Sequence, residues 1–213
     1  MPSELVHLAF AGFLAVGLLG PAFSRRSVAI VLAAAAIPDL DAVLALWVEG
    51  VHRALLHSLV AVAVLAALAA VDLRRERSLL HRAFGDEGAR VVAVAVASVA
   101  LAGIAPDLLT NGVNVFYPVV DRFYALDGHL LLSSTRGIVQ TFVEFHGGDT
   151  VVGTTQTAFY YTGVDPTRGA DPRAVERVFP VVNSGLQLLV VVTSTLVLWG
   201  RFRDQPAAEG HKR

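Results

Sequence analysis

The sequence contains no cysteine. This absence excludes disulfide bonds, zinc sites built from thiolates and a cysteine nucleophile. Charged residues are also scarce, at 16% of the 213 residues, whereas soluble domains carry about 25%. The net charge of −1 does not indicate the basic surface that nucleic acid requires. We therefore expect no nucleic-acid partner.

Apolar residues make up 54% of the chain, and they are concentrated in five blocks. Each block approaches the ~20 residues that a helix needs to cross ~30 Å of hydrocarbon. The first block has no basic residue before it, unlike a signal peptide, so we expect it to remain as a helix. The pattern predicts an all-α membrane protein with about five transmembrane helices, at residues 5–23, 27–48, 55–72, 91–117 and 178–200.

The connection between the fourth and fifth blocks is long and contains strand-like runs at residues 130–132, 138–145 and 155–161, with a turn at 147–149. It predicts a small β-rich extracytoplasmic segment. The expected organisation is a four-helix membrane core carrying the polar cluster, this outer segment, a fifth helix and a cytoplasmic tail, at residues 1–117, 118–177, 178–200 and 201–213.

Basic residues in the connections predict the orientation, because cytoplasmic loops are enriched in Lys and Arg. If every block crosses once, one side of the bilayer receives Arg25, Arg26, Arg74, Arg75, Arg77, Arg82, Arg90, Arg201, Arg203, Lys212 and Arg213. We expect a multi-pass protein of the plasma or inner membrane, with the lipid bilayer as its partner, the N-terminus outside and the C-terminus in the cytoplasm.

Ionisable residues lie inside or beside four of the apolar blocks, where each costs about 2.5–3.5 kcal/mol at mid-membrane. Counted from the nearest cytoplasmic arginine at 1.5 Å per residue, His7, His57 and Asp107 lie roughly 26–27 Å away, and Asp39 and Asp41 roughly 20–23 Å away. Because the helices alternate in direction, this agreement predicts that the polar groups gather in the same outer third of the bilayer.

Pro38 and Pro106 each directly precede an aspartate. Proline cannot donate to the carbonyl four residues earlier, so it kinks a helix and frees acceptors. Asp39 and Asp41 would point about 200° apart on a regular helix, but a kink at Pro38 could turn both inward.

Carboxylates and imidazoles gathered in one shell are the ligand set of Zn²⁺, Mn²⁺ or Fe²⁺, and a divalent cation would offset their buried negative charge. A metal-free proton relay or ion path would use the same residue types. The residues alone favour the two readings equally.

Several motifs together resemble one family. They are His7, Ile37-Pro38-Asp39-Leu40-Asp41, His52-Arg53 followed by His57-Ser58, and Asp107 with Thr110, Asn111 and Gly112 leading to Phe116-Tyr117-Pro118. In this order they resemble the YdjM-like family, which is described as LexA-binding, inner-membrane-associated, metal-dependent hydrolases. The resemblance covers roughly residues 5–120.

The resemblance implies a membrane-bound hydrolase. The location of the cluster and Arg53, and not the resemblance, point to a phosphoester, a lipid-linked substrate or another ester at the outer face as its substrate. Its divalent metal ion would be held by His7, Asp39, His57 and Asp107, with Asp41 and His52 as further candidates. Asp41 would serve as general base and Arg53 would bind an anionic substrate group, while Thr110 and Asn111 would support the site. Gly103 stands where the family usually has a histidine. The number of metal ions, one or two, therefore stays open, as does whether catalysis is retained.

Two other functions remain open at this stage. The cluster could bind and release an ion or proton in a carrier, although no inverted repeat is evident. It could also pin helices together in a non-catalytic membrane protein that binds partners.

Overall fold

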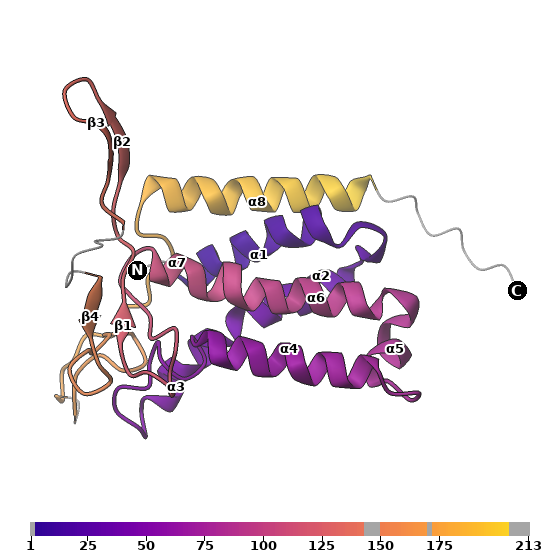
Figure 1. Ribbon diagram of the computed structural model, residues 1–213, viewed down its shortest axis with the longest axis horizontal. Coiled ribbons are helices and arrows are strands. Elements are labelled where there is room, and N and C mark those ends of the chain that lie inside the picture. Colours follow the sequence, from indigo (N-terminus) through magenta and orange to yellow (C-terminus); the bar gives the residue numbers. More distant parts are fainter. Residues whose placement is uncertain (1–2, 143–149, 170–171, 205–213) are drawn as a thin grey trace, which may run out of the picture.

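The computed structural model describes residues 3–142, 150–169 and 172–204. It is mostly helical, with long helices side by side and all the strands gathered at one end (Figure 1). The helices are α1 (Glu4–Leu18), α2 (Arg25–Ala36), α3 (Asp41–Leu44), α4 (Leu59–Leu73), α5 (Leu79–Phe84), α6 (Gly88–Ser98), α7 (Ala105–Leu108) and α8 (Gly185–Arg203). Short helical turns connect them at Gly20–Ala22, Pro38–Leu40, Gly85–Glu87 and Val99–Ile104.

Each apolar block forms a helix, but five full crossings are not established. Leu79–Leu108 and Gly185–Arg203 are long and apolar enough to span a membrane, at 30 and 19 residues. Arg25–Ala36 and Pro38–Leu44 would together make a third span with a bend of 44°. The helices Glu4–Leu18 and Leu59–Leu73 are apolar but shorter.

The expected blocks extend too far at their strand-side ends. Block two stops being helical after α3, block three begins only at Leu59, and block four ends at Leu108 instead of residue 117. Pro38 and Pro106 interrupt regular α-helix shortly before two of these ends, although the last helical residues are Leu44 and Leu108. The residues after α3, before α4 and after α7 therefore form loops at the strand-side end.

Apolar helices α4 and α8 lie on the outside of the bundle. None of the α4 residues is buried, and Ser194 is the buried residue of α8. Large apolar side chains such as Leu68 and Leu186 are therefore exposed on them. This surface is suited to lipid and not to water. The turn from α1 to α2, α5 and the end of α8, which carry the predicted cytoplasmic arginines, all lie at the end opposite the strands (Figure 1).

Glycine allows close packing at two places in the bundle. A Cβ at Gly12 would lie 2.4 Å from Ser194 Oγ of α8, so this glycine lets α1 and α8 approach. Gly17 faces nothing within 4 Å and has no such role. A Cβ at Gly103 would lie 2.7 Å from the Ala35 carbonyl oxygen and 2.9 Å from Pro38 Cγ. The histidine that the resemblance implies at this position therefore has no room here without a shift of the α2 backbone.

The strands of the outer segment match the predicted runs only in part. Strands β2 (Leu130–Ser133) and β3 (Gly137–Gln140) form an antiparallel hairpin, close to two predicted runs, while β1 (Phe123–Tyr124) pairs with β4 (Val151–Gly153). The predicted strand at 155–161 is wrong, because these residues form turns and irregular backbone that contact the helix ends. The predicted turn at 147–149, the end of the 138–145 run and the tail beyond residue 204 lie outside the described residues.

The packing at Gly103 yields a prediction. Gly103→Ala should lower the melting temperature in detergent, because the added methyl meets backbone and the proline ring, a class of overpacking that costs about 1–3 kcal/mol. Gly17→Ala is the matched control and should leave the melting temperature unchanged or raise it, because its methyl has space and glycine disfavours helix. Equal melting temperatures for the two variants would contradict this account.

Candidate metal centre

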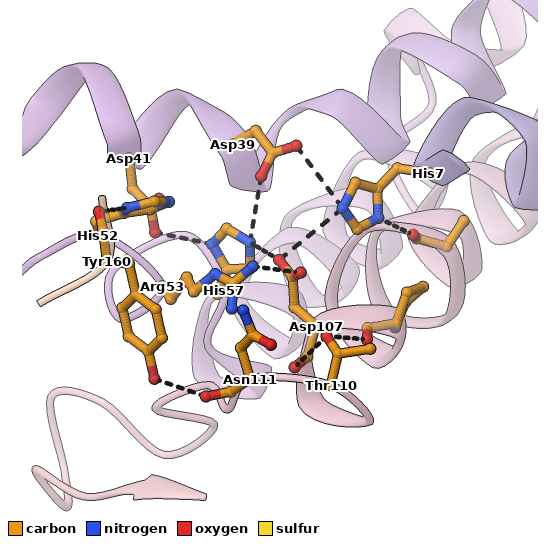
Figure 2. A network of polar contacts seen from close by, with 12 residues as sticks. His7, Asp39, Asp41, His52, Arg53, His57, Asp107, Thr110, Asn111 and Tyr160 are labelled. Atoms are coloured by element: carbon orange, nitrogen blue, oxygen red, sulfur yellow. Dashed lines mark hydrogen bonds and ion pairs between the residues drawn. The ribbon is translucent and has the colours of Figure 1, made fainter. Parts of the chain in front are cut away.

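The predicted ionisable residues meet at the strand-side end of the bundle (Figure 2). His7 comes from α1, Asp39 from the turn Pro38–Leu40, Asp41 from the start of α3 and Asp107 from α7. His52, Arg53 and His57 come from the loop that precedes α4. Apart from Asp39, these side chains are buried. The juxtaposition predicted from depth along the helices is confirmed.

Asp39 and Asp41 both face inward because the backbone at Pro38 tightens into a 3₁₀ turn. In such a turn each residue advances by about 120° instead of about 100°, so residues two apart lie about 120° apart rather than on opposite sides. The two carboxylates then hold opposite nitrogens of one imidazole. Asp39 Oδ1 lies 3.5 Å from His57 Nε2, and Asp41 Oδ2 lies 2.9 Å from His57 Nδ1.

His7 is oriented by a carbonyl that Pro106 leaves without its helical donor. In an α-helix the Ala102 carbonyl would accept from the N–H of residue 106, which proline lacks. His7 Nδ1 lies 2.6 Å from this oxygen and donates to it. A donating Nδ1 leaves Nε2 as the lone-pair nitrogen, which points toward the aspartates.

His57 is oriented in the same manner by Asp41. Its Nδ1 donates to the buried Asp41 carboxylate, and its Nε2, on the other side of the ring, donates to Asp107, so a metal ion bound at Nε2 would replace this proton. This nitrogen lies 3.2 Å from Asp107 Oδ2. An imidazole backed by a carboxylate is the arrangement that surrounds many metal-bound histidines.

Two imidazole nitrogens and two carboxylates thus converge on one small volume. His7 Nε2 lies 3.9 Å from both Asp39 Oδ2 and Asp107 Oδ2. Ligand atoms of His7, Asp39 and Asp107 all lie within 4.8 Å of one another, and His57 Nε2 stands beside them. The distances around His7 exceed hydrogen-bond length, which leaves space for a cation among imidazole nitrogens and anionic oxygens.

The charge balance of this cluster fits a divalent cation. Three carboxylates, those of Asp39, Asp41 and Asp107, meet one permanent positive charge, the guanidinium of Arg53. Burying an uncompensated carboxylate is costly, so the cluster needs further positive charge. Nitrogen and oxygen donors without sulfur suit Zn²⁺, Mn²⁺ or Fe²⁺.

Arg53 lies behind the aspartates with an unusual backbone. Its φ of +61° is rare for a long side chain and costs about 1–3 kcal/mol. Its Nη2 lies 2.6 Å from Asp107 Oδ1, and its guanidinium stacks 4.7 Å from the Tyr160 ring centroid. Its Nε and Nη1 are buried without a hydrogen-bond partner among the described residues. Buried donors of this kind call for an acceptor.

His52 stands at the edge of the cluster. Its Nδ1 lies 3.2 Å from the Tyr160 carbonyl oxygen and its Nε2 4.0 Å from Asp41 Oδ1, which has no hydrogen-bond partner among the described residues. Burial lowers the pKa of His52, so its imidazole is neutral at pH 7. Donation from Nδ1 to the carbonyl leaves Nε2 able to accept a proton.

Backbone hydrogen bonds fix the two motif loops to each other. The Asn114 N–H donates to the Arg53 carbonyl and the Leu59 N–H to the Val115 carbonyl, both at 2.9 Å. Ser58 caps α4 by accepting from the Val60 N–H, and its hydroxyl donates to the Tyr117 carbonyl at 2.6 Å. The serine that follows His57 therefore holds the ligand loop against the segment after α7.

Thr110 and Asn111 make hydrogen bonds that involve backbone carbonyls and do not contact the carboxylates of the cluster. The Thr110 hydroxyl donates to the Pro106 carbonyl at 2.9 Å, and the Asn111 carbonyl accepts from the Tyr160 hydroxyl at 3.0 Å. Burial raises the pKa of Tyr160. Tyr160 contacts His52 and Arg53 but was not predicted as a site residue. Nothing in the sequence around residue 160 indicated that the outer segment returns to the site.

A cavity of about 530 Å³ opens over the cluster. The cluster side contributes Asp39, His52, Arg53 and Asp107, and α1 adds Glu4, which the sequence analysis did not single out. The outer segment forms the opposite wall, with residues 161–164, Pro166, Glu176 and 178–180. The site is therefore accessible from the strand-side end, between the helix ends and the outer segment.

No curated protein and no solved structure matches this chain. The model of the YdjM inner membrane protein family matches residues 1–169, which include every residue of the cluster and most of the outer segment. The chain therefore belongs to the YdjM inner membrane protein family.

Proposed function

We propose that this protein is a metal-dependent hydrolase that cleaves a phosphoester or another ester at the outer face of the inner membrane. The observation that carries the proposal is the convergence of two oriented imidazole nitrogens on two aspartates at the floor of an open cavity. The N-terminus would lie outside and the C-terminus in the cytoplasm. Residues 1–117 would form the membrane core, with residues 118–177 as the outer segment.

His7, Asp39, His57 and Asp107 would hold the metal ion. When bound, a divalent ion lowers the pKa of a water ligand toward neutrality and polarises the ester. The chain prepares this site before binding, because the Ala102 carbonyl fixes the His7 ring and Asp41 fixes the His57 ring.

The surrounding side chains take the remaining roles. Asp41 is fully buried and bonded to His57, so its role is to position that ring. His52, which lines the cavity, takes the role of general base. His52 Nε2 accepts a proton from a water in the cavity and returns it to the leaving alkoxide. Arg53 binds the anionic oxygen of the ester group and holds it toward the aspartates.

The packing of the bundle supports an enzyme over a carrier. Apolar side chains, including Ala15, Leu19, Val31 and Val91, form a buried core between the site and the arginine-bearing end. The cavity opens at the strand-side end. Ser98 donates to the Val31 carbonyl within this core, but among the described residues no buried ionisable side chain lies there to continue an ion path from the cluster.

Metal content tests the ligand set. The protein purified in detergent should contain about one divalent ion per chain by elemental analysis, and Asp39→Ala and His57→Ala should lose it, because each removes a ligand. Asp121→Asn is the control, because this carboxylate binds Asn114 and Thr155 outside the cluster. Metal at background level in the unchanged protein, after loading with Zn²⁺, Mn²⁺ and Fe²⁺, would refute the proposal.

The role of Asp41 has its own test. Asp41→Asn keeps the size of the side chain but weakens the hold on His57 Nδ1, so metal affinity should fall about 10–100-fold. The loss should appear as a smaller metal-induced rise in melting temperature, which does not depend on turnover. An affinity equal to that of the unchanged protein would show that Asp41 does not position His57.

Hydrolysis is tested with phosphomonoester, phosphodiester and carboxylic ester substrates. At least one class should be cleaved by the metal-loaded protein, with activity lost in EDTA and restored by metal. His52→Gln should lower kcat by about 10²-fold or more while metal content stays stoichiometric, because general base catalysis contributes about 10²–10⁴-fold. Full metal occupancy with no cleavage of any class would favour the non-catalytic alternative.

A further inference from the structure

The cavity joins two different surfaces. Its floor is the polar cluster, whereas the far wall includes Val164, Pro166 and the run Val178–Phe179–Pro180. A pocket that bound a small hydrophilic ester would not need an apolar wall of this kind. The combination suits a molecule with one charged group and one apolar part.

Arg53 indicates which charged group would be bound. Its guanidinium is 1% exposed, lines the cavity and has two nitrogens, Nε and Nη1, without a hydrogen-bond partner among the described residues. An oxyanion would satisfy these donors, and arginine is well suited to phosphate. Glu176 lines the same cavity and would repel a second anionic group. One phosphate therefore fits better than a diphosphate.

The apolar wall is continuous with the surface that faces lipid. Val178 and Phe179 are exposed at 59% and 65%, and α8 begins at Gly185 with exposed apolar residues along its length. A chain that lay along this run would leave the cavity beside α8 and enter the bilayer. A lipid could therefore keep its tails in the membrane while its headgroup reached Arg53.

We propose that the cavity binds a membrane amphiphile through a single phosphate in its headgroup, with Arg53 on the phosphate and Phe179 against the apolar part. This inference rests on the proposed function for its location, and it names the substrate class of the same site.

The test measures binding without turnover. The full chain is placed in phosphatidylcholine nanodiscs with Mn²⁺, and native mass spectrometry gives the dissociation constant of a phosphonate analogue of phosphatidic acid, whose P–C bond resists hydrolysis. Diacylglycerol, which lacks the phosphate, and 3,4-dihydroxybutylphosphonate, which lacks the tails, are the comparison probes. The analogue should bind at least about tenfold more tightly than either probe, because each lacks one of the two contacts.

Two variants assign the contacts. Arg53→Gln should weaken binding of the analogue about tenfold or more. Phe179→Ser should weaken the analogue and reduce its preference over the tailless probe. Leu130→Ser is the matched control, because Leu130 on β2 is about as exposed as Phe179, at 67% against 65%, but lies neither in the cavity lining nor on the run that leads to α8. If Arg53→Gln fails to fold, the comparison of Phe179→Ser with Leu130→Ser decides the question.

The outcomes separate this inference from the proposed function. Tight binding of the analogue without hydrolysis of any ester would support the amphiphile site and refute the hydrolase. Metal-dependent hydrolysis of soluble esters, with equal affinity for tailed and tailless probes, would support the hydrolase and overturn the amphiphile site. Equal binding of diacylglycerol and the analogue would also overturn it, because the phosphate would then contribute nothing.

Discussion

The outer end of this protein is organised around one ring, the imidazole of His57. Asp41 holds its Nδ1 at 2.9 Å, and Asp107 lies 3.2 Å from its Nε2. These contacts join α3, the loop before α4 and α7. The ring is fully buried, so its nitrogens depend on these acids for partners. Its orientation fixes where Nε2 is presented and therefore where a cation can bind.

Proline provides much of this arrangement through what it lacks. Pro106 has no N–H for the Ala102 carbonyl, and His7 occupies that oxygen. Pro38 begins the 3₁₀ turn that brings Asp39 and Asp41 to the same imidazole. In both cases a local disruption of helix supplies a feature of the site, and the aspartate that follows each proline is thereby directed inward.

Much of the site was predictable because helix rise converts sequence distance into depth. His7, Asp39, His57 and Asp107 were placed together by counting from arginines, and they lie together. The inward turn of both aspartates followed from Pro38. Their roles as ligands remain proposals.

Other features could not be predicted, since they depend on contacts distant in sequence. The return of Tyr160 to Arg53 joins residues more than a hundred positions apart, and the run around it was wrongly predicted as a strand. The burial of Gly103 against the Ala35 carbonyl depends on the packing of two helices. The helix ends were also misplaced, because hydropathy does not distinguish a membrane helix from apolar loop residues such as Val113 and Val115, which are buried under the site.

The apolar core beneath the cluster has a kinetic consequence. Because the cavity opens at the strand-side end and Leu19, Val31 and Val91 fill the space below, whatever enters must leave by the same opening. An incoming molecule and a departing one therefore compete for the same opening. The reaction would follow a strict order of release before reloading, and a product that lingers would act as a competitive inhibitor.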